Sequence, residues 1–171
     1  MYKRQVYVAR YAENERWFLQ KAGAFVAGKF DDAPLAVFEN GVELLDLYVE
    51  VGEETPRILR VNAVWRLSAE AGPHDTFFTH RGASNQPPFA QQDGDAWATA
   101  LPLAAWPRNQ PILDVREFEL DDGWSANAND ALTITVGLYN WVNGERLSGR
   151  DRNNAPLPNN GWTFQSPLFH E

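Results

Sequence analysis

The sequence predicts an all-β protein: an antiparallel β-sandwich, of jelly-roll or immunoglobulin-like type, with about eight strands and one short N-terminal helix. Residues 132–138 alternate aliphatic side chains with Thr and Gly, and residues 59–67 alternate apolar with mostly polar side chains. A period of two puts each apolar row on one face of a strand. Aromatic residues make up 13% of the chain, with seven Trp and one Met, which suits pleated sheets better than a helical bundle. At 171 residues we expect one domain with a sizeable core.

The N-terminal segment is predicted to hold one strand and one helix. Residues 6–11 alternate as a short strand does. From Glu13 to Gly28 the apolar side chains recur at helical spacing, with acids in the first turn and a glycine near the end, which favours a helix. We expect residues 31–171 to form the sandwich, and residues 6–30 to belong to it or to end an upstream domain.

The first five residues carry a separate signal. Residues 1–5, MYKRQ, resemble the translation of a transposase sequencing adaptor, a contaminant found at the ends of metagenomic contigs. We therefore expect residues 1–5 to be a scar on a fragment that lacks its genuine N-terminus. The sequence has no signal-peptide core in residues 1–10 and no apolar run near the ~20 residues of a membrane helix, but a truncated start makes this uninformative.

The rest of the chain reads as strands separated by turns. Asn143-Gly144 tolerates positive φ at both central turn positions, so it predicts a hairpin whose return strand begins at Glu145. Residues 95–111 have no period and hold three prolines, which predicts a long connection crossing the sandwich. The expected strand starts are Val42, Arg57, Asp75, Phe89, Ile112, Ala131, Glu145 and Trp162.

Charge and composition exclude several classes of function. The formal net charge is -8, so the basic surface that binds a phosphate backbone is not expected, and neither is a nucleic-acid partner. The absence of Cys excludes disulfides, thiolate metal sites and thiol nucleophiles. The chain has no H-E-x-x-H motif, no Gly-rich phosphate loop and no dinucleotide fingerprint.

The sharpest acidic pattern is Asp93-Gly94-Asp95. Two carboxylates in one turn supply hard oxygen ligands and make Ca²⁺ the one metal to consider at Asp93 and Asp95. The alternative is an ordinary Asx turn, which we prefer because the sequence offers no third acid nearby. No other cofactor is expected.

His80 is the histidine that we consider as a candidate catalytic residue. Paired with Asp93 or Asp95, it would serve an all-β hydrolase. The chain lacks a nucleophile-elbow pattern, and a strand over residues 75–81 puts His80 on the face opposite Phe77. These observations favour a hydrogen-bonded structural histidine, so we expect no catalysis by this segment.

Tryptophans in predicted loops and turns are the stronger candidates for binding. An indole face can stack on a sugar ring while Asn, Gln and Asp side chains bond its hydroxyls. The alternative is that they plug the ends of the sandwich. The candidate ligand-binding residues are Trp97, Trp106, Trp124 and Trp141.

A set of short motifs resembles a known family. The chain holds FTH at residues 78–80, AQQDG at 90–94, Trp106, Asp114, and GLYN with GERL at 137–147. These motifs resemble those of a β-sandwich appended to certain bacterial membrane glycosyltransferases, which are themselves similar to dolichyl-phosphate-mannose protein mannosyltransferases. In that family the motifs run in the order F-V-H-L, A-Q-x-D-G, W, D, G-L-Y-D and G-E-R-L. The resemblance covers about residues 38–147. The motif residues are His80, Asp114, Gly137, Tyr139, Glu145 and Arg146.

The resemblance implies an extracytoplasmic accessory domain that follows a multi-span catalytic portion, and the catalytic acids of the family belong to that portion. Our first hypothesis is a non-catalytic β-sandwich of the cell envelope that contacts a glycan, an acceptor protein or the membrane glycosyltransferase domain. The alternative is a freestanding secreted carbohydrate-binding or adhesion module.

The shared residues also have a structural explanation. Asp93 next to Gly94 suits a turn, and Gly137 permits close packing on a strand face. Glu145-Arg146 would fix the hairpin by pairing with Asp114 or with a backbone carbonyl. We prefer this framework interpretation to a shared binding site.

Overall fold

The computed structural model describes residues 7–11, 17–21, 33–52, 58–82, 87–96, 101–120 and 132–166. None of these residues lies in an α-helix, and no helix in these ranges is long and apolar enough to cross a membrane. The elements are β1 (Tyr7–Tyr11), β2 (Trp17–Lys21), β3 (Ala36–Phe38), β4 (Val42–Val51), β5 (Ile58–Leu67), β6 (Asp75–Arg81), β7 (Ala90–Gly94), the 3-10 turn η1 (Leu103–Ala105), β8 (Pro111–Glu119), β9 (Leu132–Asn140), β10 (Gly149–Asp151), the 3-10 turn η2 (Pro158–Asn160) and β11 (Trp162–Ser166).

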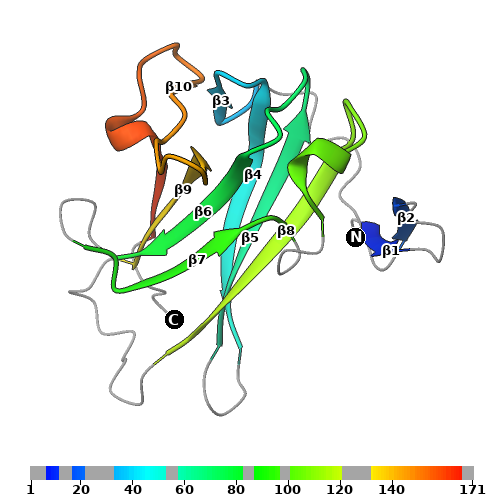
Figure 1. Ribbon diagram of the computed structural model, residues 1–171. Helices are drawn as coiled ribbons and strands as arrows, with labels where there is room; N and C mark the ends of the chain where they lie inside the picture. Colours follow the sequence, from blue (N-terminus) through cyan, green and yellow to red (C-terminus); the bar gives the residue numbers. More distant parts are fainter. Residues whose placement is uncertain are drawn as a thin grey trace.

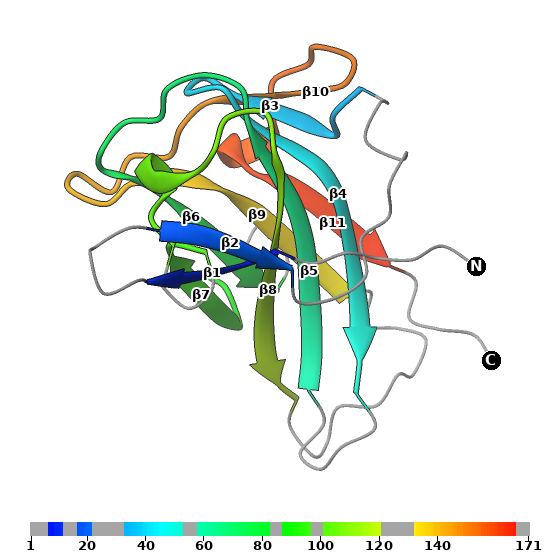
Figure 2. The same cartoon turned by 90° about the vertical axis from the view of Figure 1, so that its right-hand side faces the viewer.

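Two antiparallel sheets pack face to face as a sandwich (Figure 1). The five-stranded sheet has the order β10-β3-β4-β5-β8, and the four-stranded sheet has the order β11-β9-β6-β7. Figure 2 shows β4, β5 and β8 running in front of β9 and β11. The predicted all-β antiparallel sandwich is confirmed. Strands β1 and β2 pair separately as a two-stranded sheet.

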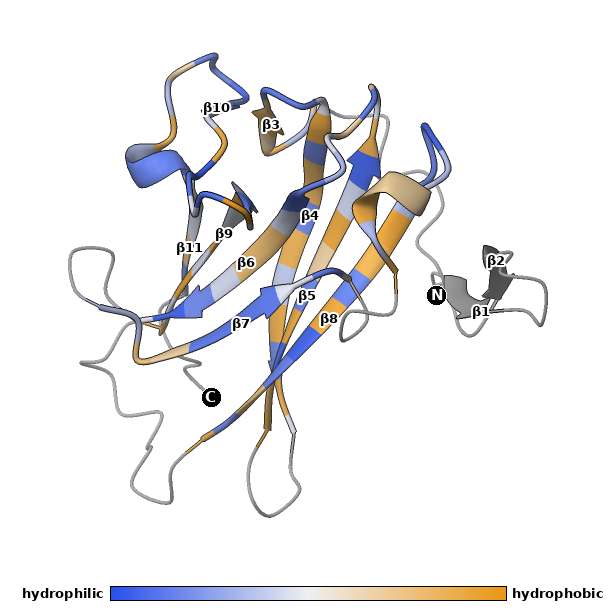
Figure 3. Cartoon of the chain, in the orientation of Figure 1, coloured by the Kyte–Doolittle hydropathy of each residue, from blue (hydrophilic) through white to orange (hydrophobic). Residues whose placement is uncertain are grey.

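Aromatic rings fill the space between the sheets. Trp65 on β5 packs against Phe38 on β3, with ring centroids 6.1 Å apart, and against Phe77 on β6 at 5.0 Å. The Phe77 ring stacks on Trp106 at 5.2 Å and 22°. All four side chains are at most 5% exposed. The apolar and polar residues that alternate along β4 and β8 in Figure 3 supply further inward-facing side chains to this core.

The predicted inner row of β5 is confirmed. Its members are all at most 4% exposed: Leu59, Val61, Ala63, Trp65 and Leu67. On the opposite face Arg60 and Arg66 are partly exposed as the alternation predicts, but Asn62 and Val64 are buried. Strand β5 lies between β4 and β8, and long side chains of a neighbouring strand cover part of this face; Asn62 donates a hydrogen bond to Glu50 of β4 at 3.5 Å.

The helix predicted from Glu13 to Gly28 is wrong where the structure describes this segment. Residues Trp17–Lys21 form β2, which pairs antiparallel with β1 from Tyr7 opposite Lys21 to Tyr11 opposite Trp17. Trp and Phe favour strands, and a neighbouring strand satisfies their backbone groups, which outweighs the helical spacing. The strand predicted over residues 6–11 is confirmed as β1. The remainder of the predicted helix and residues 1–5 lie outside the described residues.

The described residues give the sandwich nine strands where about eight were predicted, because the short strand β3 was not among the expected starts. A hairpin turn occurs at residues 141–144, but the predicted pair of positive φ values at Asn143 and Gly144 is wrong, because only Gly144 has one, at +75°. The returning chain makes one isolated bridge, between Tyr139 and Arg146. The buried Leu147 then carries the chain across to the other sheet, where β10 pairs with β3, so the strand expected from Glu145 begins at Gly149.

The connection predicted to cross the sandwich is confirmed. It leaves β7 at the edge of the four-stranded sheet and enters β8 at the edge of the five-stranded sheet. Its described part includes η1 and the buried Trp106, which anchors it to the core. The crossing places β7 and β8 next to each other along one side of the molecule (Figure 1).

Candidate functional site

Several motif residues gather on the outer face of the four-stranded sheet. Phe78 on β6 lies opposite Gly137 on β9 and opposite Asp93 on β7. His80 lies two residues further along β6, and Arg146 contacts both His80 and Phe78. Cross-strand partners and residues two apart share a face of a sheet, so these side chains point the same way. We call Phe78, His80, Asp93, Gly137 and Arg146 the motif face.

Phe78 is the apolar centre of the motif face. Its side chain is 1% exposed although it points away from the main core. The Arg146 guanidinium lies 4.2 Å from the centroid of the Phe78 ring, in a cation–π contact. A Cβ atom on Gly137 would lie 2.6 Å from Phe78 Cζ, so a glycine is needed there to leave room for the ring. This is the close packing that the sequence led us to expect at Gly137.

The His80 ring lies between the Asp93 carboxylate and the Arg146 guanidinium. Its Nε2 lies 3.2 Å from Asp93 Oδ1, but the geometry does not make a hydrogen bond, and this buried atom has no other partner among the described residues. Its Nδ1 lies 3.4 Å from Arg146 Nη2. Because a guanidinium can only donate, Nδ1 is the acceptor and the neutral ring carries its proton on Nε2, beside Asp93. No hydroxyl among the described residues bonds to His80.

Asp95 and Tyr139 lie at the end of this face. Asp95 Oδ1 accepts a hydrogen bond from Thr76 Oγ1 at 2.9 Å. Burial raises the pKa of the Asp95 carboxyl, against the lowering effects of that bond and of Arg116. Burial also raises the pKa of the Tyr139 phenol, helped by the negative charges of Asp93 and Asp95 and opposed by Arg116. Thr76, which donates to Asp95, lies opposite Tyr139 in the sheet.

The two candidate Ca²⁺ ligands take different partners. Asp93 faces His80, and Asp95 bonds Thr76. Within the described ranges, no group of three or more His, Cys, Asp or Glu side chains is placed to hold a metal ion. The arrangement of Asp93 and Asp95 therefore gives the Ca²⁺ hypothesis no support.

The candidate tryptophans are dispersed. Trp106 is 5% exposed, stacks on Phe77 and donates from Nε1 to the Leu101 carbonyl, so its ring faces belong to the core. Trp141 is 58% exposed at the hairpin turn, where it meets His74 edge to face. Trp97 and Trp124 lie outside the described residues.

The remaining motif residues have framework contacts. Arg146 donates to the Asn159 carbonyl at 3.1 Å, which is one of the two contacts expected for it. Glu145 accepts a hydrogen bond from Asn143 within the turn at 2.7 Å. Asp114 lies on the inner face of β8, where it is 2% exposed and pairs with Arg116 at 2.7 Å rather than with the hairpin.

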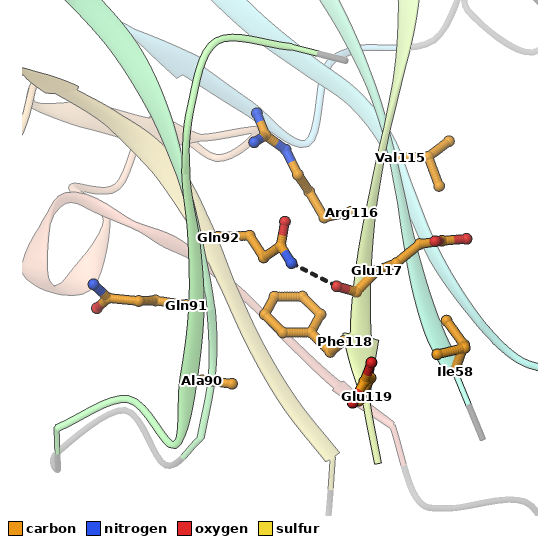
Figure 4. Close-up of a pocket in the computed structure, with 9 residues that line it drawn as sticks. All are labelled: Ile58, Ala90, Gln91, Gln92, Val115, Arg116, Glu117, Phe118 and Glu119. Carbon is orange, nitrogen blue, oxygen red and sulfur yellow. Dashed lines mark hydrogen bonds between the residues drawn. The ribbon is translucent and has the colours of Figure 1, made fainter. Parts of the chain in front are cut away.

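A groove of about 750 Å³ lies between β7 and β8, the edge strands of the two sheets. In Figure 4, Gln92, Arg116 and Phe118 lie between the two strands, whereas Gln91 points to the other side of β7. The lining residues are Ile58, Ala90, Gln91, Gln92, Val115, Arg116, Glu117, Phe118 and Glu119.

Side chains bonded to backbone carbonyls join the two edges of the groove. Gln92 Nε2 donates to the Glu117 carbonyl at 2.7 Å (Figure 4). Arg116 Nη2 reaches in the opposite direction, to the carbonyls of Gly94 at 2.8 Å and Asp95 at 3.0 Å. Arg81 Nη1 donates to the Glu119 carbonyl at 3.3 Å. The bonds of Gln92 and Arg116 therefore join β7 to β8 across the groove, and the bond of Arg81 joins β6 to the end of β8.

Polar groups and one aromatic ring stand at the mouth of the groove. Gln92, Glu117 and Glu119 are exposed there, whereas Gln91 is exposed on the other side of β7. Phe89, next to the lining residue Ala90, is 76% exposed, and the Arg81 guanidinium lies 5.4 Å from the centroid of its ring. Because Arg81 also bonds Glu119, Phe89 stands at the Glu119 end of the groove.

Sequence reasoning did not identify this groove. It placed Phe89 at the start of a strand and Gln91 and Gln92 within a family motif, but assigned binding to tryptophans. The groove depends on β7 and β8 being neighbours across two sheets, and their residues are separated by the long connection. The one available signal was the run of amides after an isolated aromatic residue, F-A-Q-Q, between two loops.

Comparison with known proteins adds no relative: no family model, no curated protein and no solved structure matches this chain. The class of protein established here is therefore that of the two-sheet antiparallel β-sandwich.

Proposed function

We propose that this chain is a non-catalytic, carbohydrate-binding β-sandwich whose ligand lies in the groove between β7 and β8. The observation that carries the proposal is the groove itself, which is lined by the exposed residues Gln92, Glu117 and Glu119 and has the exposed Phe89 ring next to its lining residue Ala90. Amides and carboxylates bond sugar hydroxyls, and an aromatic face packs against the apolar face of a pyranose.

The arrangement of acids supports binding rather than hydrolysis. Glycoside hydrolysis needs two carboxylates on opposite sides of the scissile bond, about 5–9 Å apart. Glu117 and Glu119 lie two residues apart on one strand and so share one face of β8. His80 and Asp93 form a close pair, but no described hydroxyl bonds to His80 to act as a nucleophile.

The motif resemblance supports a wider proposal for the parent protein. It favours an extracytoplasmic accessory domain of a glycosyltransferase-like membrane protein, in which this domain contacts the glycan, the acceptor or the membrane domain. Sequencing the source locus upstream of this frame tests it. Several apolar spans there would support the proposal, and a signal peptide directly before Val6 would overturn it in favour of a freestanding secreted module.

The binding site is tested with two exposed aromatic residues. Phe89→Ala removes the ring at the groove, and Trp141→Ala is the matched control at the hairpin turn; both side chains are more than half exposed, so neither change should unfold the domain. On a glycan array, followed by titration calorimetry with the best neutral oligosaccharide, we expect Phe89→Ala to weaken binding about tenfold or more. We expect Trp141→Ala to change it less than twofold.

The two variants separate the two candidate sites. Loss of binding in Trp141→Ala with Phe89→Ala unaffected would move the site to the hairpin turn that the sequence indicated. Absence of binding to every glycan on the array would overturn the proposed function.

A further inference from the structure

We propose that the groove selects neutral glycans and rejects anionic ones such as uronates and sulfated sugars. This inference rests on the proposed function and deepens it. It follows from the charges around the groove, where each described cation is already engaged by the protein and an exposed carboxylate stands at the mouth.

Arg116 is the cation closest to the floor of the groove. It is 4% exposed, and its Nε bonds Asp114 at 2.7 Å. Its Nη2 bonds the Gly94 and Asp95 carbonyls. A guanidinium that neutralises a buried carboxylate offers little net charge to a ligand, because a second anion would compete with Asp114 in a site of low polarity.

The two cations at the rim are engaged as well. Arg60 Nε pairs with Glu117 Oε1 at 2.8 Å. Arg81 is 8% exposed, donates to the Glu119 carbonyl, and lies over the Phe89 ring. Arg60 and Glu117 therefore add no net charge to the mouth of the groove, and burial keeps the Arg81 guanidinium away from a ligand.

The remaining charge at the mouth is negative. Glu119 is exposed, and no ion pair or hydrogen bond joins its carboxylate to another of the described residues. The chain as a whole has a formal charge of -8. An anionic sugar would meet repulsion from Glu119 with no free guanidinium to offset it, whereas the hydroxyls of a neutral sugar can donate to the same carboxylate.

A charge reversal tests this selectivity. The probes are a panel of neutral and acidic oligosaccharides that includes one matched pair, oligogalacturonates with free carboxylates and the same oligomers fully methyl-esterified. Dissociation constants are measured for the native chain, for Glu119→Lys, and for Glu70→Lys. Glu70 makes the same charge change far along the chain, at a surface pair in which its side chain is 87% exposed.

We expect the native chain to bind neutral probes more tightly than acidic ones, and Glu119→Lys to strengthen binding of acidic probes about fivefold at low salt. Glu70→Lys should leave both classes unchanged. Equal binding of neutral and acidic probes by the native chain, or an equal gain in Glu70→Lys, would overturn the selectivity while leaving carbohydrate binding in place. Failure to bind any probe would instead overturn the proposed function, and the selectivity with it.

Discussion

The two faces of β8 carry the same kind of ion pair in opposite environments. On the inner face, Arg116 and Asp114 lie 2.7 Å apart, and their side chains are 5% and 2% exposed. On the outer face, Glu117 pairs with Arg60 of β5 at 2.8 Å, and their side chains are 56% and 36% exposed. The distances are nearly equal, so burial rather than distance must decide what each pair contributes to stability.

Burial makes the inner pair interdependent. Each charge has lost most of its water, and the partner charge together with the Gly94 and Asp95 carbonyls replaces it. The outer pair keeps contact with solvent, which screens the attraction and can replace either partner. The two pairs on β8 have similar distances, but we expect the buried pair to be required for stability and the exposed pair to contribute little.

The largest effect is expected from breaking the inner pair. Arg116→Met leaves the Asp114 carboxylate buried without its partner, so we expect the free energy of unfolding to fall by about 3–5 kcal/mol in urea denaturation. The double substitution Asp114→Leu with Arg116→Met should lose less than the sum of the two single changes, because no buried charge is left alone. A loss below about 1 kcal/mol for Arg116→Met would contradict the role we give to this pair.

A smaller effect is expected on the outer face. In a double-mutant cycle of Arg60→Ala and Glu117→Gln, the coupling energy should be about 0.2–1 kcal/mol and should fall as salt is added. A coupling as large as that of the inner pair, or one that salt does not change, would show that exposure does not distinguish the two faces.

The smallest effect is expected at Asp95, next to the inner pair, and it should be a gain. Burial raises the pKa of Asp95 in the folded chain, so its ionised form costs stability above that pKa, and the cost disappears as pH falls below the ordinary value of 3.8. Asp95→Asn keeps an oxygen for the Thr76 bond but carries no charge. Its unfolding free energy relative to the native chain should therefore be higher at pH 7, and the difference should close near pH 3.5. A difference that is constant with pH would rule out ionisation as its cause.

The sequence contained most of the sheet architecture, because period-two alternation directly reports which face of a strand is buried. The inner row from Leu59 to Leu67 and the strand at residues 132–140 follow from this rule. The N-terminal segment did not, since five residues of β2 are too few for periodicity to separate helix from strand when the pairing partner is unknown. The short strand β3 was missed for the same reason.

The candidate site was less accessible from the sequence. Asp114 and Arg116 lie on the inner face of β8, and Val115 and Glu117 lie on the outer face. Period-two alternation assigns the inner face to apolar residues, so it could not predict a buried charged pair there. The sequence also does not show whether an aromatic ring outside a strand is buried. Trp106 and Phe89 both lie outside strands, yet Trp106 is buried in the core and Phe89 is 76% exposed. Only the packing of the two sheets separates these cases.

The bonds across the groove have a consequence for the behaviour of the protein at high concentration. A sheet edge with open carbonyls invites a strand of another molecule, and this is a common route to aggregation. Along β7 and β8, the carbonyls of Gly94, Glu117 and Glu119 already accept hydrogen bonds from side chains of the same chain. The contacts that join β7 and β8 thus also occupy acceptors that a foreign strand would need, so they disfavour edge-to-edge pairing on this side of the molecule.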